Sequence, residues 1–201
     1  SLSLNHEDIE AESTASDSIK KMEGTYLNSD FTYGILLDKR NQTFQTTDGY
    51  SASFYQSLPI IQDSSSSSNS FFVNNWHEFS ENVIGSLKFQ LKSVHGIDDD
   101  VRLTNRLFIP TKKLRGFVNG KVGPKDGKDW IGGNYVYGLS AEAQLPNLLP
   151  ESYKTDFRVF LDTAHVWGVD YSDTINESSE LRSSIGAVSY TTLTRPTTPS
   201  L

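Results

Sequence analysis

Three charged residues have the types and the spacing to hold one another: Arg115, Glu142 and Asp162. The two acids lie on successive segments of alternating polarity, each on the face that carries the polar side chains. A guanidinium presents a rigid fork of N–H donors that suits carboxylates, and two carboxylates can hold it from two sides. If the segment around Arg115 folds back over these strands, we expect Arg115 to be clamped between the two acids.

The same two acids also fit glycoside hydrolysis, which uses a pair of carboxyl groups. Such an enzyme needs one carboxyl group with a raised pKa, whereas an arginine between the two would hold both ionised. We therefore favour a structural clamp and expect no catalytic residue.

No other group of residues indicates a metal or cofactor site. The aspartates at 98–100 lack the glycine and the distal glutamate of an EF-hand loop, so a solvated turn is the better interpretation. Gly132 and Gly133 are not followed by the lysine and the serine or threonine of a phosphate-binding loop. The histidines are scattered, with no partner at metal-binding spacing: His6, His77, His95 and His165. We expect no metal and no cofactor.

Composition narrows the classes of protein. The chain has 201 residues, of which 36% are hydrophobic and 21% charged, and its formal net charge is -7. This acidic balance argues against nucleic acid, which requires a basic surface. Without cysteine there is neither a disulfide nor thiolate chemistry. No run of about 18 apolar residues is present, but a membrane-spanning β-strand needs only about 9–11 residues of alternating polarity.

Alternating polarity is the main structural signal, and it predicts about seven β-strands joined as an antiparallel meander. The clearest example is NYVYGLSAEAQLP, in which Tyr135 and Leu139 face one way and Glu142 faces the other. In TDFRVFLDTAHVWG, Asp162 lies on the face opposite to Leu161. The first segment, SLSLNHEDI, alternates weakly and fits the end of a strand.

A long segment interrupts the predicted strands. Its part from Lys112 to Asn134 carries six glycines, one proline and eight formal charges. Loops of this length are typically functional or disordered. Six apolar residues argue against a disordered linker: Leu114, Phe117, Val118, Val122, Trp130 and Ile131.

The apolar face of such a sheet can pack on a second sheet in a soluble sandwich, or it can face lipid in an outer-membrane barrel. The polar faces are rich in Ser, Gly, Gln, Glu, Lys and Asp, which suits a water-filled lumen. Tyrosines and tryptophans lie near strand ends, as they do at membrane interfaces. Pattern alone leaves both arrangements open, with the barrel ahead.

Four motifs in order, LRGF…GP…IGGN, SAEAQLP, VFLDTAHVW and RSSIG, resemble the barrel domain of the bacterial surface-antigen superfamily, over most of residues 31–189. The resemblance implies an all-β fold, an antiparallel up-and-down transmembrane β-barrel of the outer membrane. About seven of its sixteen strands would be present here. It also implies that the loop after the family's eleventh strand tucks into the lumen.

The resemblance further assigns site residues. The lumen-loop motif corresponds to six positions: Leu114, Arg115, Gly116, Phe117, Gly123 and Pro124. The family's arginine contacts an acid in a Ser-x-Glu pattern and an acid in a Phe-x-Asp pattern, which are Glu142 and Asp162 here. Ala164 stands where the family usually has glycine, a departure that we expect to leave the salt bridges intact.

The implied organisation is a partial surface-antigen barrel over 1–201, with strands at 31–96, the lumen loop at 97–133 and further strands at 134–192. Because the chain begins without methionine and ends without a structural signal, we expect an internal fragment that lacks the family's POTRA domains and closing strands. The segment LTRPTTPSL also lacks the turn that the family has near Thr191.

The function implied by the resemblance is assembly of outer-membrane β-barrels, that is, folding and inserting outer-membrane proteins in the bacterial outer membrane. The expected partners are unfolded outer-membrane proteins, assembly-complex lipoproteins and outer-membrane lipids, with no nucleic acid. The alternatives are an autotransporter-assembly or two-partner-secretion barrel of the same superfamily, a passive outer-membrane pore, or a soluble β-sheet binding module.

Overall fold

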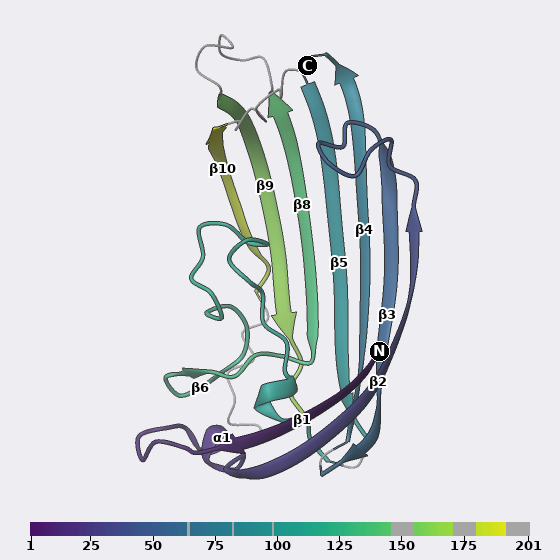
Figure 1. Cartoon of the computed structure of the whole chain (residues 1–201). Coiled ribbons are helices and arrows are strands. Elements are labelled where there is room, and N and C mark those ends of the chain that lie inside the picture. Colours follow the sequence, from purple (N-terminus) through teal and green to yellow (C-terminus); the bar gives the residue numbers. More distant parts are fainter. Residues whose placement is uncertain (64, 82, 98, 146–154, 171–179, 192–201) are drawn as a thin grey trace, which may run out of the picture.

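Eight antiparallel strands form one curved sheet in the order β1-β2-β3-β4-β5-β8-β9-β10 (Figure 1). The structure is a computed structural model that describes residues 1–63, 65–81, 83–97, 99–145, 155–170 and 180–191. The strands of this sheet are β1 Leu2–Ile9, β2 Gly24–Asp38, β3 Gly49–Gln62, β4 Ser66–Ser80, β5 Val83–Gly96, β8 Tyr135–Leu145, β9 Thr155–Trp167 and β10 Arg182–Thr191.

This all-β meander confirms the fold class predicted from alternating polarity, with one strand more than the seven expected. The additional strand is β1, which pairs with β2 over its full length, from Leu2 opposite Phe31 to Ile9 opposite Gly24. The weak alternation of SLSLNHEDI indicated only the end of a strand, because backbone pairing does not require alternating side chains. The sheet therefore begins well ahead of residue 31.

The two faces of the sheet differ in polarity, as a sheet between lipid and water requires. One face exposes large apolar side chains, among them Leu87, Leu161 and Ile185, which are 49%, 48% and 83% exposed. The opposite face of β5, β8 and β9 carries Gln90, Glu142 and other polar residues. Neighbours along each strand therefore face surfaces of different polarity.

The segment between β5 and β8 lies over the inner face of β8 and β9 (Figure 1). Because β5 ends at Gly96 and β8 begins at Tyr135, this segment spans the range expected for the loop. It contains a 3-10 turn, η1 Leu103–Asn105, and a small hairpin of β6 Lys125–Asp126 and β7 Asp129–Trp130. Paired hydrogen bonds between Leu107 and Gly133, of 2.8 and 3.0 Å, close its base.

A small hydrophobic core forms between this loop and the sheet. Its buried members are Ile109, Leu114, Val122, Val136, Ala164 and Val166. The first three come from the loop and the others from β8 and β9. Leu114 and Val122, two of the six apolar residues that set this segment apart from a linker, thus attach it to the sheet, and Phe117 packs at the edge of the core.

Two further observations complete the fold. A short helix, α1 Asp17–Lys20, lies in the connection between β1 and β2. Within the described ranges, no helix has the length and apolar character needed to cross a membrane. Residues 98, 146–154, 171–179 and 192–201, which belong to the ranges expected for the loop, the later strands and the divergent end, lie outside the described residues.

If the apolar face meets lipid, Leu161→Arg in the full-length protein should lower the free energy of unfolding by about 2–4 kcal/mol, since a charge near the bilayer midplane is poorly solvated. The measurement is urea unfolding of the barrel in lipid vesicles. The matched control is Ser53→Arg on the water-facing side of β3, which should cost less than about 1 kcal/mol. Equal costs for the two variants would contradict the assignment of the faces.

Candidate functional site

Arg115 and Asp162 form the centre of the site. The Arg115 side chain donates from Nε to Asp162 Oδ2 and from Nη2 to Oδ1, each at 2.7 Å. The backbone N–H of Arg115 also donates to Oδ2, at 3.1 Å. One carboxylate thus accepts three hydrogen bonds from one residue, in the two-pronged geometry that gives the strongest arginine pairs.

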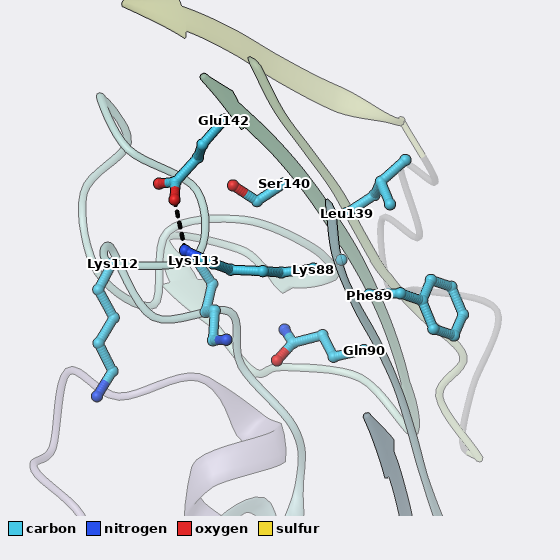
Figure 2. Close-up of a pocket in the computed structure, with 9 residues that line it drawn as sticks. Lys88, Phe89, Gln90, Lys112, Lys113, Leu139, Ser140 and Glu142 are labelled. Atoms are coloured by element: carbon cyan, nitrogen blue, oxygen red, sulfur yellow. Dashed lines mark hydrogen bonds and ion pairs between the residues drawn. The ribbon is translucent and has the colours of Figure 1, made fainter. Parts of the chain in front are cut away.

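Glu142 holds the guanidinium from the other side. Arg115 Nη1 donates to Glu142 Oε1 at 2.7 Å, and Nη2 also donates to Ser140 Oγ at 3.0 Å. Ser140 Oγ in turn donates to Asp162 Oδ1 at 2.6 Å. The second oxygen of Glu142 accepts a hydrogen bond from Lys88 Nζ on β5 (Figure 2). The structure therefore brings together the three residues that the sequence singled out.

Strand register places these groups. Ser140 lies opposite Asp162, and Glu142 lies opposite Phe160, in the antiparallel pairing of β8 and β9. Alternate residues of a strand share a face, so all four side chains reach the inner side together. The Phe160 ring lies 3.6 Å from Arg115 Cζ and adds a cation–π contact to the ion pairs.

The charges at this site suit a structural role better than a catalytic one. Hydrogen bonds to Asp162, the largest cause, and to Glu142 raise the pKa of Arg115 above its ordinary value, although burial acts in the opposite direction. The Asp162 side chain is fully buried and that of Arg115 is 19% exposed. A permanent cation between two carboxylates keeps the loop in place and provides neither a free acid nor a free base.

The other residues of the motif shape the loop around Arg115. Leu114 is fully buried in the core, and Phe117 packs against its edge. Gly116 and Gly123 have φ of +86° and +113°, in the region that favours glycine. A Cβ at Gly123 would also come within 2.8 Å of Val166 side-chain atoms, so the loop approaches β9 more closely there than other residues permit. Pro124, which follows, is buried.

Sequence reasoning missed a second arginine that fastens the start of the loop. Arg102 is 5% exposed and donates from Nη2 to Asn28 Oδ1 at 2.6 Å. Its guanidinium also lies 4.2 Å from the centre of the Tyr26 ring. Both partners are on β2, some 75 residues away along the chain, and no local pattern links them to the sequence DDDVRLTN. Lys88 was missed for the same reason, since its partner depends on the pairing of β5 with β8.

Two aspartates tie the loop to neighbouring segments. Asp170, after β9, accepts hydrogen bonds from the Val101 backbone at 2.8 Å and from the Asn134 side chain, so it links the two ends of the loop. Asp126 on β6 accepts from the Ser18 backbone at 3.0 Å and from Ser18 Oγ at 2.6 Å. The connection that contains α1 is thereby bound to the loop hairpin.

Comparison with known proteins identifies relatives of the whole sheet. The profile of the Omp85 superfamily domain matches residues 1–190. The outer membrane protein assembly factor BamA of Neorickettsia risticii (strain Illinois) is 29% identical over 185 residues, which cover 89% of this chain and 25% of that protein. The crystal structure of BamA from Haemophilus ducreyi lacking POTRA domains 1-3 superposes with a TM-score of 0.76 at 19% identity, over 94% of this chain and 43% of that one.

The chain matches only part of each relative. The chain spans about a quarter of the length of the curated relative and less than half of the solved structure. At 19% identity the structural likeness shows a shared fold, the BamA-type barrel wall.

The clamp predicts that Arg115→Lys destabilises loop docking although the charge is kept, because an ammonium cannot reproduce the planar fork. Arg115→Ala should cost more, about 3–5 kcal/mol, since it leaves Asp162 buried without its partner. The measurement is the rate of proteinase K cleavage within residues 112–133 of the folded full-length protein. The control, Lys128→Ala, removes an exposed cation of the same loop and should cleave at the wild-type rate. Wild-type cleavage of Arg115→Ala would contradict the clamp.

The Asp126 contact predicts an acid-sensitive attachment of α1. Hydrogen bonds from the side chain and backbone of Ser18 hold the pKa of Asp126 below its ordinary value of 3.8. A lowered carboxyl pKa stabilises the attachment above pH 3.8 and loses that contribution as the pH falls through the lowered pKa. Hydrogen exchange of residues 16–21, corrected for intrinsic rates, should therefore accelerate below about pH 4. Asp126→Asn should flatten this profile, and an unchanged profile would contradict the assignment.

Proposed function

The chain belongs to the Omp85 superfamily and forms part of an outer-membrane β-barrel, and from this we propose that it serves in folding and inserting outer-membrane proteins. The proposal is supported by likeness to a curated assembly factor over most of this chain. Because that likeness covers a quarter of the relative, the activity is proposed for the whole protein of which this sheet would be one wall.

The observation that carries the proposal is the fastened loop. Arg115 joins the loop to β8 and β9, and Leu114 is buried against the same strands. A loop held by charge and by apolar packing obstructs the inner side of the wall, which argues against a passive pore with an open lumen. We accordingly propose residues 97–133 as the lumen loop, with strands on either side at 31–96 and 134–192.

The role proposed for the six motif residues and the two acids is structural. They would set the shape of the inner wall, and no residue is assigned to catalysis. Client proteins would be unfolded β-barrel chains, whose strands pair with an exposed strand edge through backbone hydrogen bonds. Assembly lipoproteins and outer-membrane lipids are the further partners proposed.

A charge reversal tests the role of the clamp. Arg115→Glu in the full-length gene places three carboxylates together, so the loop should be released and porin levels in the outer membrane should fall several-fold. Lys128→Glu makes the same charge change at an exposed site of the loop and should leave porin levels unchanged. If Arg115→Glu accumulates as a folded barrel and porin levels also stay normal, the clamp has no role in assembly.

The range of affected clients separates the related functions. Depletion of the full-length protein should lower many unrelated outer-membrane β-barrels if it is a general assembly factor. Loss of autotransporters alone, or of one secreted partner alone, would favour the autotransporter-assembly or two-partner-secretion alternative. A large steady conductance of the purified barrel in planar bilayers would favour the pore.

A further inference from the structure

A cavity of about 270 Å³ lies beside the clamp, between the inner face of β5 and β8 and the loop. Its polar lining includes Lys88, Gln90, Lys112, Lys113 and Glu142 (Figure 2). With about 30 Å³ for each water molecule, the volume suits a polyatomic solute better than a single ion. The arginine clamp uses Glu142, and Lys88 pairs with the same carboxylate, so Gln90, Lys112 and Lys113 are open to a separate role.

Positive charge is in excess around this cavity. Together with the clamp it gathers four cations, Lys88, Lys112, Lys113 and Arg115, against the carboxylates of Glu142 and Asp162. Arg115 and Lys88 satisfy both acids. In the described part of the chain, the amino groups of Lys112 and Lys113 have no carboxylate within ion-pair distance. This excess stands out in a protein whose formal net charge is -7.

Gln90 supplies a second and independent observation. It is 5% exposed, and its amide makes no hydrogen bond to the described residues. Figure 2 shows the amide directed into the same space as the Lys113 amino group. The amide therefore faces the cavity with its N–H groups available to an acceptor on a bound ligand.

The amino group of Lys113 lies in an environment that disfavours its charge. It is half-buried, and burial lowers the pKa of its amino group, while the positive charges of Lys88 and Lys112 lower it further. Binding of an anion stabilises a site in which several cations lie close together. The anion reduces the repulsion between the cations and offsets the cost of burying a charge without a partner.

We propose that this cavity binds a small water-soluble phosphate, free or as a monoester, through the amino group of Lys113 and the side-chain amide of Gln90, with Lys112 adding positive charge at its edge. The N–H groups of an ammonium and an amide match the several acceptor oxygens of a phosphate. The cavity is on the inner face, away from the exposed apolar residues, which favours a soluble source over a lipid headgroup. The inference stands apart from the proposed assembly function, since it needs only the folded wall and loop.

The test is calorimetric titration of the full-length barrel in neutral detergent with inorganic phosphate, at constant ionic strength set with sodium chloride. Saturable binding by the wild-type protein is expected. Lys113→Met and Gln90→Leu should each weaken it at least tenfold, the first by removing a charge and the second by removing only the amide. Lys121→Met, an exposed lysine in the same loop, should bind as the wild type does.

Folding is checked separately by the heat-dependent migration of each variant on gels, and only folded variants are compared. Because Gln90→Leu leaves the loop and every charge intact, it keeps the test valid if Lys113→Met disturbs the nearby clamp. Absence of saturable phosphate binding in the wild type would overturn the proposal. So would equal affinities of Gln90→Leu and the wild type, or binding seen only with vesicles that contain phosphatidic acid.

Discussion

The inner architecture of this wall depends on one guanidinium. Arg115 joins the loop to two neighbouring strands through Asp162, Glu142 and Ser140, with Phe160 beneath it. Asp162 is fully buried, and a buried carboxylate is tolerable only when a cation and hydrogen bonds replace the water it has lost. The position of the loop and the ionisation of Asp162 are therefore coupled.

Strand register is subject to the same constraint. Ser140 and Asp162 are directly opposite each other, and both must face inward to meet Arg115. A slip of one residue would turn Asp162 toward the apolar outer surface and bring Leu161 inward. The clamp thus adds an electrostatic penalty to the hydrophobic penalty that already opposes the slip. The register of the strands and the position of the loop therefore stabilise each other.

Charge on the inner face is organised around the clamp rather than spread evenly. Lys88 shares Glu142 with Arg115 and so connects β5 to the same network. With both acids satisfied, Lys113 and Gln90 remain beside a cavity without partners of their own among the described residues. More cations than carboxylates beside a partly enclosed cavity favour the binding of an anion there.

The sequence by itself determined the alternating strands, the apolar character of the loop and the identity of the three residues that meet at the clamp. Those features are local or are contained in short motifs such as LRGF and the strand patterns around Glu142 and Asp162. It indicated β1 only as the end of a strand, because its alternation is weak, and it did not reveal the roles of Lys88, Arg102 and Gln90. The surroundings of these three residues are set by strand register and by the path of the loop. Only the tertiary structure decides these, because contacts between residues some 50 to 75 positions apart leave no periodic trace in the chain.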